Sequence, residues 1–249
     1  MSDGLAGVVL AAGAGTRLRP LTFLRPKALC PVANVPLVDL ALERARSVVD
    51  DVAVNIHHGR AAMEAHLAGS VHLSLEEERP LGTAGALAHL RGWLDGRAAL
   101  VLNADAWCPG SLASFVTGWD RRRVRLLLAG DEALGSRSRV AGALMPWSTI
   151  ESLTAEPSGL YEASWRGALS AGRLEVVRHD RPFIDCGTPR QYLEANLAAS
   201  AGQSVVGEGA VVAGKIDRCV VWPGAVVWPQ ESLTCAIRMT DIKTVIVRR

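Results

Sequence analysis

The chain has 249 residues, of which 49% are hydrophobic and 21% charged, and its net charge is +2. This length suits one α/β domain of about 200 residues with a small appendage, and the low net charge excludes general nucleic-acid binding. The five cysteines form no C-x-x-C pair, which excludes a zinc site of known spacing and favours reduced thiols in the cytoplasm. No apolar run approaches the about 20 residues of a membrane span, and we expect no signal peptide.

The first apolar run, residues 5 to 10, predicts a buried strand that ends at a small-residue loop, residues 11 to 15. Two cations follow the loop: Arg17, and Lys27 directly after a proline. Backbone N–H groups reach a phosphate only where side chains are absent, and Arg or Lys neutralises its charge. We therefore interpret this stretch as a nucleoside triphosphate site, with a tight strand-to-helix turn as the alternative. Leu18 stands where a dinucleotide or kinase loop needs glycine, and the Gly-Lys-Ser/Thr of a P-loop is missing.

Strands and helices then alternate along the first half of the chain. Apolar periodicity predicts helices at 36–49, 60–67 and 84–94, and buried strands at 52–56, 71–75 and 98–102. This alternation favours a mostly parallel sheet with helices on both faces. Sites in such sheets lie beyond the carboxyl ends of the strands. The small-residue loop, the Gly-Thr-Ala-Gly segment at 82–85 and Asp105 all fall there, so we expect them to share one site.

The second half of the chain is less regular. Further strands are predicted at 124–128, 141–144, 174–177 and 183–185, and helices at 161–169 and 189–199. From residue 202, valines recur at about six-residue steps, at Val206, Val212, Val221 and Val227. This texture resembles hexapeptide repeats that coil into a left-handed β-helix, and a small irregular β-appendage is the alternative. We therefore divide the chain into a main domain, residues 1–201, and an appendage, residues 202–249, which is the candidate contact of a homo-oligomer.

The stretch GAGTRLRPLT, followed by RPKALCPVANVP, resembles the nucleotide-binding signature of the sugar-1-phosphate nucleotidylyltransferases, also called NDP-sugar pyrophosphorylases. The resemblance implies a Rossmann-like α/β catalytic domain and a transferase of the EC 2.7.7 type that works in nucleotide-sugar biosynthesis. Its reaction joins a nucleoside triphosphate to a sugar 1-phosphate and releases pyrophosphate. By the same resemblance, the nucleotide-binding residues are Leu10, Ala11, Ala12, Gly13, Gly15, Thr16, Glu77, Gly82, Thr83 and Asn103.

The reaction needs little covalent work from the protein, because an oxygen of the sugar phosphate attacks the α-phosphorus in line while pyrophosphate leaves. We expect Arg17 to neutralise the β- and γ-phosphates, and Lys27 to contact the α-phosphate or the sugar phosphate. Asp105, at the end of LVLNAD, and Asp185, in a D-x-G-T-P motif, match the two metal-ligand aspartates of the family. Mg²⁺ is the expected cofactor, since one or two carboxylates plus phosphate oxygens suffice to bind it. A helix N-cap is the alternative role for Asp105.

Glu77 occupies the position, five residues before Gly82, that contacts the base in the family. A carboxylate accepts both adjacent N–H donors of guanine, whereas uracil presents one N–H between two carbonyl oxygens. This favours GTP, and the mannose-1-phosphate guanylyltransferases are the group that the chain resembles most. Because Glu76 and Glu78 flank Glu77, the sequence does not determine which of the three glutamates contacts the base. The alternative to a base contact is a solvated acidic turn.

The sequence matches the sugar-binding residues of the family less completely. Relatives carry a Glu-Lys-Pro segment whose lysine holds the sugar phosphate, and here Glu156-Pro157 lacks that lysine. Arg137 and Arg139 are the candidate substitute cations, and Gly142 and Glu162 the candidate lining of the sugar pocket. A uridylyltransferase acting on an amino-sugar 1-phosphate is the close alternative. A non-catalytic, nucleotide-sugar-binding regulatory subunit is the alternative from another class.

Overall fold

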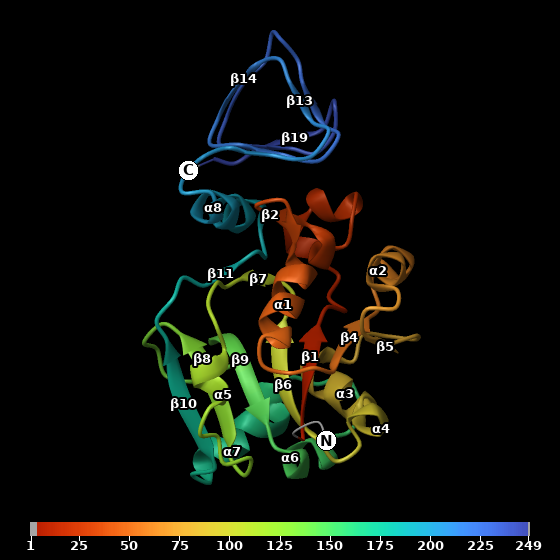
Figure 1. The fold of residues 1–249 in the computed structure, drawn as a ribbon, viewed down its shortest axis with the longest axis vertical. Coiled ribbons are helices and arrows are strands. Elements are labelled where there is room, and N and C mark those ends of the chain that lie inside the picture. The colour runs from red at the N-terminus through yellow and green to blue at the C-terminus, as the bar shows by residue number, and fades with distance from the viewer. Residues whose placement is uncertain (1–3, 249) are drawn as a thin grey trace. The chain divides into compact units, whose positions relative to one another are not determined.

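The computed structural model describes residues 4–248, which form two compact units (Figure 1). The sheet unit consists of residues 4–14, Val38–Ala104 and Cys108–Phe183. The second unit consists of Gly15–Leu37, Asp105–Trp107 and residues 184–248. Within residues 4–248, no helix combines the length and the apolar character that crossing a membrane requires.

A seven-stranded sheet forms the centre of the sheet unit, with the strands in the order β10-β8-β9-β6-β1-β4-β5. These strands are β1 (Leu5–Leu10), β4 (Val52–Ile56), β5 (His72–Leu75), β6 (Ala98–Asn103), β8 (Val124–Ala129), β9 (Arg139–Met145) and β10 (Leu174–His179). β9 runs antiparallel to β6 and β8, while the other neighbouring pairs of this sheet are parallel. The predicted α/β fold with a mixed, mostly parallel sheet is therefore confirmed.

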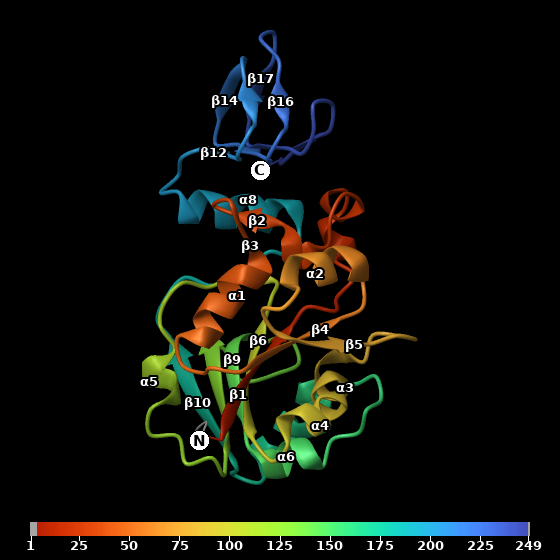
Figure 2. The same cartoon turned by 45° about the vertical axis from the view of Figure 1, so that its right-hand side comes forward.

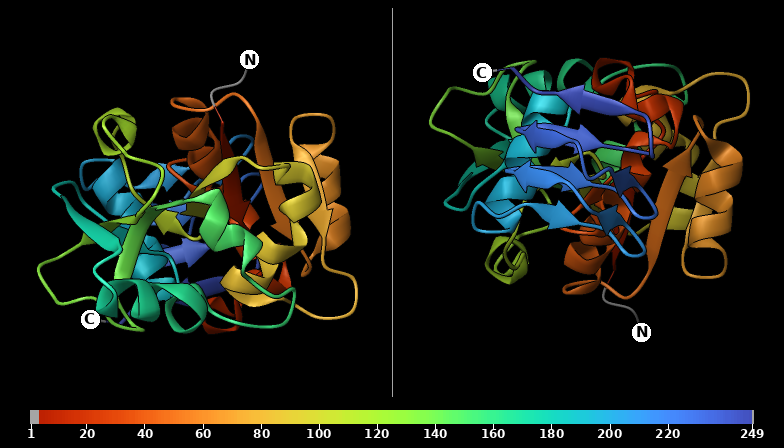
Figure 3. Two further views of the ribbon diagram at one scale, coloured as in Figure 1. Left: turned by 90° about the horizontal axis from the view of Figure 1, so that it is seen from below. Right: turned by 90° about the horizontal axis from the view of Figure 1, so that it is seen from above.

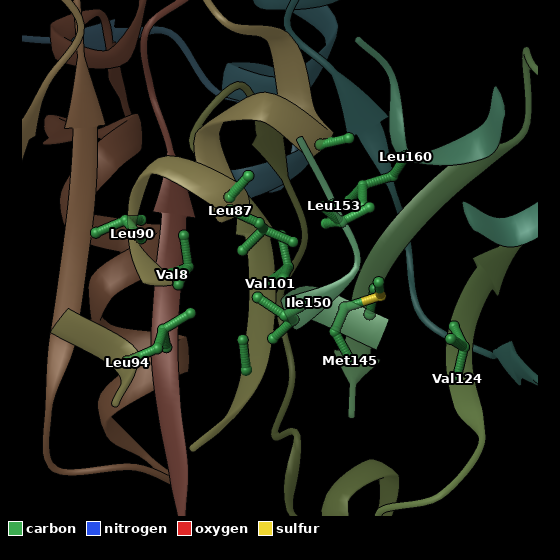
Figure 4. Close-up of a cluster of buried hydrophobic side chains, with 14 of the residues drawn as sticks. Val8, Leu87, Leu90, Leu94, Val101, Val124, Met145, Ile150, Leu153 and Leu160 are labelled. Carbon is green, nitrogen blue, oxygen red and sulfur yellow. The ribbon is translucent and has the colours of Figure 1, made fainter. Parts of the chain in front are cut away.

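Helices cover both faces of this sheet. They are α1 (Leu37–Arg46), α2 (Arg60–Leu67), α3 (Gly82–His89), α4 (Arg91–Leu94), α5 (Ala113–Val116), α6 (Trp147–Glu151), η4 (Tyr161–Trp165) and α7 (Arg166–Ser170). Val8 and Val101 belong to one buried cluster with Leu87 of α3 and residues of α4 and α6 (Figure 4). Leu102 follows Val101 and therefore points to the opposite face, where Phe115 of α5 also lies. Apolar burial on both faces stabilises the central strands.

Three predicted elements differ from the structure. The helix predicted at 84–94 is divided into α3 and α4, because Leu90 has φ −81° and ψ 0° and so leaves the helical conformation. The helix predicted at 161–169 begins with the π-helical turn η4 and continues as α7. The strand predicted at 141–144 is longer, as β9, and it is antiparallel because the loop from β8 is too short for a parallel crossover. Periodicity does not predict α5 or α6, since each is too short to display a period.

In the second unit, a helix packs against a hairpin that follows short turns. The turns are η1 (Thr16–Leu18), η2 (Leu21–Phe23) and η3 (Lys27–Leu29), the hairpin consists of β2 (Pro31–Val32) and β3 (Val35–Pro36), and the helix is α8 (Pro189–Ala199). α8 starts at the predicted proline, and the side chain of Thr188 caps it. Two buried side chains of α8 fasten the hairpin: Asn196 Oδ1 accepts from Ala33 N at 3.0 Å, and Tyr192 OH donates to Pro31 O.

Short strands fill the C-terminal part of the second unit. They are β12 (Val205–Val206), β13 (Val211–Val212), β14 (Lys215–Asp217), β15 (Val220–Val221), β16 (Val226–Val227), β17 (Ser232–Thr234), β18 (Ala236–Arg238) and β19 (Thr244–Ile246). β12, β13 and β14 pair in parallel with β15, β16 and β17, and these strands trace a triangular outline in Figure 1. The paired strands lie along one another in Figures 2 and 3. Two of the recurring valines, Val221 and Val227, are fully buried between the strands.

Candidate active site

Three neighbouring strands of the sheet unit reach the same edge beside the small-residue loop. In register, Leu10 of β1 pairs with Asn55 of β4 and with Asn103 of β6. The loop begins directly after Leu10. A Cβ placed on Gly13 would meet no neighbouring heavy atom within 4 Å, so the backbone here is open to a ligand. Open backbone at the end of a buried strand is what the approach of a phosphate requires.

A buried pair, Asn55 and Glu76, connects the start of this loop to the Gly-Thr-Ala-Gly segment. Asn55 Oδ1 accepts from Ala11 N at 2.8 Å, and Asn55 Nδ2 donates to Glu76 Oε1 at 2.7 Å. The other carboxylate oxygen of Glu76 accepts from Leu81 N at 2.8 Å. Asn55 and Glu76 are 2% and 4% exposed, so these bonds replace water for both side chains. Neither residue is among the predicted site residues, and the only signal for Asn55 is an amide inside the apolar run VAVNI.

Gly82 and Thr83 fix the segment at the start of α3. Gly82 has φ +70°, and a Cβ there would lie 2.5 Å from Ser158 O, so other residues are excluded by both conformation and space. Ala84 N donates to the same carbonyl oxygen at 3.0 Å. Thr83 Oγ1 accepts from Leu160 N at 2.8 Å. The segment therefore holds residues 158–160 next to the start of α3.

Glu76 and Glu77, the first two of three consecutive glutamates before this segment, have different surroundings. Glu76 is buried and both its carboxylate oxygens are hydrogen-bonded. The Glu77 side chain is 74% exposed and its carboxylate lies 3.8 Å from Arg60 Nη1. Glu77 also lines an open hollow with Leu81 and His89. Of Glu76 and Glu77, only Glu77 is therefore accessible to a ligand.

A cavity of 260 Å³ lies at the ends of β1 and β6. Leu10 and Val101 contribute to its apolar lining, together with the rings of Tyr161 and Trp165. Its polar lining consists of Thr83, Asn103, Ser136, Ser138, Tyr161 and Glu162. The cavity thus combines apolar side chains with a few polar groups, as small-molecule sites do.

The structure brings one of the four predicted sugar residues into this cavity. Glu162 lines it, whereas Arg137, Arg139 and Gly142 are not part of the lining. A Cβ at Gly142 would lie 3.2 Å from Leu102 Cδ2, so Gly142 faces the packed side of β9. Arg137 and Arg139 are exposed.

In the second unit, Lys27 lies between two aspartates. Lys27 Nζ is 2.9 Å from Asp105 Oδ2 and 3.4 Å from Asp185 Oδ1. The aspartates meet because β7 (Ala106–Trp107) pairs with β11 (Ile184–Asp185), and Cys186 N donates to Asp105 O at 2.9 Å. A strand and not a helix follows Asp105, so the alternative role of Asp105 as a helix N-cap is wrong.

Two glycines leave room for this cluster. Gly15 has φ +61°, and a Cβ there would lie 2.9 Å from Lys27 Cβ. A Cβ at Gly187 would lie 2.9 Å from Arg17 Nη2 and 3.0 Å from Asp185 Oδ1. Arg17 Nη2 is itself 3.6 Å from Asp185 Oδ2. The Arg17 side chain is 70% exposed and that of Lys27 10%, so Arg17 is open to an anion while Lys27 is nearly enclosed.

The two aspartates suit a magnesium ion. Their carboxylates both contact Lys27 Nζ, so two groups with oxygen donors lie close together. Mg²⁺ prefers oxygen ligands and binds through one or two carboxylates, with substrate phosphates and waters completing its shell. Within residues 4–248 there is no group of three or more His, Cys, Asp or Glu side chains that could hold a metal, so binding here would depend on phosphate oxygens.

Buried thiols adjoin the cluster without taking part in its chemistry. Burial raises the pKa of Cys30 and of Cys186 to about 12, although the charge of Lys27 opposes this. Burial also raises the pKa of the Tyr192 hydroxyl. These groups stay protonated at neutral pH, so neither cysteine supplies a nucleophilic thiolate.

Similarity to known proteins identifies the family. The family model "Nucleotidyl transferase" matches residues 6–126. An N-acetylmuramate alpha-1-phosphate uridylyltransferase of Caulobacter vibrioides is 37% identical over 233 residues, which cover 78% of this chain and 95% of that protein. The chain belongs to the sugar-1-phosphate nucleotidylyltransferases. This nucleotidylyltransferase is also 36% identical to a mannose-1-phosphate guanylyltransferase of Mycobacterium tuberculosis over 115 residues, which cover 44% of this chain and 32% of that protein.

The predicted family and enzyme class are thereby confirmed: the protein is a transferase of the EC 2.7.7 type. Among solved structures, a UDP-glucose pyrophosphorylase from Acinetobacter baumanii superposes with a TM-score of 0.62 at 18% identity, covering 78% of this chain and 92% of that one. That likeness shows that the two proteins share a fold.

Proposed function

We propose that this nucleotidylyltransferase uses GTP and Mg²⁺, and that Arg17, Lys27, Asp105 and Asp185 carry out the transfer. The position of Lys27 between the two aspartates, with Arg17 beside Asp185, supports this most directly. Two cations and two carboxylates in one cluster suit a triphosphate together with a divalent cation.

Lys27 positions the reacting phosphates. An oxygen of the sugar phosphate forms a bond to the α-phosphorus, and the bond from that phosphorus to pyrophosphate breaks. A lysine has three N–H donors, and two of those of Lys27 bond to Asp105 and Asp185. The third remains for an oxygen of the α-phosphate or of the sugar phosphate. Because the aspartates orient the ammonium before substrate binds, no reorganisation is needed during the transfer.

Arg17 neutralises the charge that develops on the leaving pyrophosphate. Its exposed guanidinium offers five donors in a planar fork, which matches phosphate oxygens. Asp105 and Asp185 would hold a magnesium ion, which would supply further neutralisation of phosphate charge. The backbone of Leu10 to Thr16 contacts the phosphates and the ribose, with Asn103 beside it, and the open space at Gly13 supports this assignment.

Glu77 is the proposed contact for guanine, next to Gly82 and Thr83. Its exposed carboxylate supports this, because the neighbouring Glu76 is already fully hydrogen-bonded. Loss of a bidentate contact to a base costs about 1–3 kcal/mol. Glu77→Gln should therefore lower kcat/KM with GTP by about tenfold or more while leaving the value with UTP unchanged or higher. An equal loss with both nucleotides would contradict the role of Glu77 in base selection.

Uridylyl transfer to an amino-sugar 1-phosphate is the second candidate function. The Caulobacter vibrioides relative, whose name states a uridylyltransferase of that kind, is covered over 95% of its length. A non-catalytic nucleotide-sugar-binding subunit is less well supported, since a pure binder needs no pair of metal aspartates.

For the rest of the chain, we keep the division into a catalytic domain, residues 1–201, and an appendage, residues 202–249. The repeated parallel pairings support a short left-handed β-helix in the appendage. Its exposed apolar side chains, which include Trp228 and Ile246, support a homo-oligomer contact there. Free cysteines at all five positions support a cytoplasmic location.

Pyrophosphate release separates these functions. The protein is incubated with Mg²⁺, one of GTP, UTP, dTTP or ATP, and one member of a panel of sugar 1-phosphates. We expect release with GTP. Release with UTP alone would support the second candidate, and no release with any pair would leave the binding subunit as the function.

A further inference from the structure

A second pocket of the sheet unit, of 310 Å³, lies where β8 and β10 begin. Val124, the first residue of β8, lines this pocket, and Val124 N donates to Arg173 O at 3.2 Å, directly before β10. Residues of α6, η4 and α7 complete the lining, and α6 and α7 lie at the lower end of the sheet in Figure 1. We call this space the arginine pocket, because Arg122 and Arg173 belong to its lining.

The arginine pocket is separate from the cavity at the ends of β1 and β6. That cavity lies at the carboxyl ends of parallel strands, whereas the arginine pocket lies at the amino ends of another parallel pair. The segment η4 contributes to both linings with different residues: Tyr161, Glu162 and Trp165 line the cavity, and Ala163 and Ser164 line the pocket. None of the predicted site residues lines the arginine pocket, so the proposed transfer reaction does not use it.

The lining of the arginine pocket is positively charged. Among the described residues that line it, Arg122 and Arg173 are the charged ones. Within residues 4–248, no hydrogen bond or ion pair engages either guanidinium group. The nearby acids have other partners: the Asp120 carboxylate accepts from Arg122 N and from Arg123 Nε, each at 2.9 Å, and Glu175 pairs with an arginine of β8. A pocket with two uncompensated positive charges attracts an anion.

Hydroxyl groups supply the other polar lining of the arginine pocket. Ser148, Thr149 and Ser152 come from α6 and its C-terminal end, and Ser164 comes from η4. Ser164 Oγ is buried, and no group of residues 4–248 forms a hydrogen bond with it. A buried hydroxyl without a partner is unfavourable, so Ser164 favours a ligand that accepts a hydrogen bond. Ser152 Oγ donates to Thr149 O at 2.8 Å and keeps its lone pairs for donors of a ligand.

We propose that the arginine pocket binds a small phosphate monoester that carries hydroxyl groups. A phosphate monoester has three free oxygens and about 1.5 to 2 negative charges at pH 7, which suit two guanidinium groups and one hydroxyl donor. A carboxylate has two oxygens and one charge, so it engages fewer of these groups. The volume of 310 Å³ is at the lower end of the range of about 300–1,000 Å³ for small-molecule sites, which suits a compact ligand. The proposal goes beyond the transfer reaction and does not depend on it.

Calorimetric titration with glycerol 3-phosphate tests the proposal. Because the cluster around Arg17 and Lys27 also attracts phosphates, the titrations use the full chain with Arg17→Gln and Lys27→Ala, and the unaltered protein is the reference. We expect glycerol 3-phosphate to bind at least about tenfold more tightly than glycerol, which lacks the phosphate, or glycerate, which has a carboxylate instead. Adding Arg122→Gln and Arg173→Gln should weaken the binding of glycerol 3-phosphate by at least about tenfold.

A blocking variant distinguishes loss of the pocket from loss of the fold. Gly167 of α7 lines the pocket, and a Cβ there would meet no neighbouring heavy atom within 4 Å, so a larger side chain occupies the pocket without a clash. Gly167→Leu should abolish the binding of glycerol 3-phosphate without lowering stability in urea, because leucine favours a helix more than glycine does. Gly92→Leu makes the same change at an open position of α4 outside the pocket, and it should leave binding unchanged.

The hydroxyl of Ser164 gives a further readout. Ser164→Ala should weaken the binding of glycerol 3-phosphate by about threefold or more, because a donor to the phosphate is lost. It should not lower stability in the absence of the ligand, since the hydroxyl has no partner in residues 4–248. Glycerate that binds as tightly as glycerol 3-phosphate, binding that persists in the Arg122→Gln and Arg173→Gln variant or in Gly167→Leu, or no binding by the unaltered protein would overturn the proposal.

Discussion

The second unit and the sheet unit present charge in opposite ways. Around Lys27 the second unit gathers two cations and two carboxylates, with pairs separated by 2.9, 3.4 and 3.6 Å. In the cavity of the sheet unit, Glu162 is the one charged side chain of the lining. Phosphates and a divalent cation are common to every reaction of this kind, and they require charge. The hydroxyl-rich lining of the cavity suits an uncharged polar group instead, so the two regions suit different parts of the proposed substrates.

The largest effect should come from removing the ammonium group of the second unit. In Lys27→Ala, Asp105 and Asp185 lose their shared partner and the reacting phosphates lose a donor, so we expect turnover to fall by about 10²–10³-fold. Circular dichroism should show an unchanged fold. Lys215→Ala, which removes an exposed lysine of the same unit, is the matched control. Turnover equal to that of the unaltered protein would refute the role of Lys27.

The second largest effect should come from replacing one aspartate of the same cluster. Asp185→Asn keeps the shape of the side chain and removes the charge that Mg²⁺ prefers, so the Mg²⁺ concentration for half-maximal activity should rise by at least about tenfold. Asp217→Asn removes an exposed carboxylate of β14 and should leave the Mg²⁺ dependence unchanged. If the two substitutions change the Mg²⁺ concentration for half-maximal activity equally, Asp185 is not a ligand of Mg²⁺.

A smaller effect is expected from the buried pair of the sheet unit. Asn55→Leu leaves Glu76 Oε1 and Ala11 N without a partner, which should lower the free energy of unfolding by about 1–3 kcal/mol. Because the pair connects the small-residue loop to residue 81, KM for the triphosphate should rise more than KM for the sugar 1-phosphate. Denaturant titration and steady-state kinetics measure the two quantities. A change in stability with equal changes in both KM values would leave the pair a purely structural role.

The buried thiols of the second unit predict the direction of a pH effect on stability. Burial raises the pKa of Cys30 and Cys186 from the ordinary value of 9.0 to about 12, so the unfolded chain releases these protons at lower pH than the folded one. Their contribution to stability is complete below pH 9 and is lost as the pH rises towards 12, at up to about 1.4 kcal/mol per thiol and pH unit. The free energy of unfolding should therefore fall less steeply in that range when both cysteines are replaced by alanine. Identical slopes of the free energy of unfolding against pH in the two proteins would contradict the assignment of this effect to Cys30 and Cys186.

The charged cluster could be predicted from the sequence because its residues stand in motifs. Lys27 follows a proline in the stretch after the loop, and Asp185 stands in D-x-G-T-P. What the sequence does not contain is the contact itself, which depends on the pairing of β7 with β11, each of only two residues. Strands of that length display no period.

The cavity of the sheet unit could be predicted only in part. Of the four residues that the sequence predicts for the sugar, Glu162 lines it, whereas Gly142, Arg137 and Arg139 do not. The directions of Arg139 and Gly142 depend on β9, which is antiparallel, and on the bulge at Leu127 and Leu128 in its partner strand. Arg137 lies in the loop before β9. One residue of shift moves a side chain to the other face of a sheet, and apolar periodicity does not fix such a register.

The measurement that tests the central claim most directly is pyrophosphate release by the unaltered protein with GTP, Mg²⁺ and a panel of sugar 1-phosphates, with and without EDTA. We predict release that requires both substrates and that stops when EDTA removes the metal. Release that continues in EDTA, or no release with any nucleotide and any sugar 1-phosphate, would contradict the assignment of nucleotidylyl transfer to the cluster around Lys27.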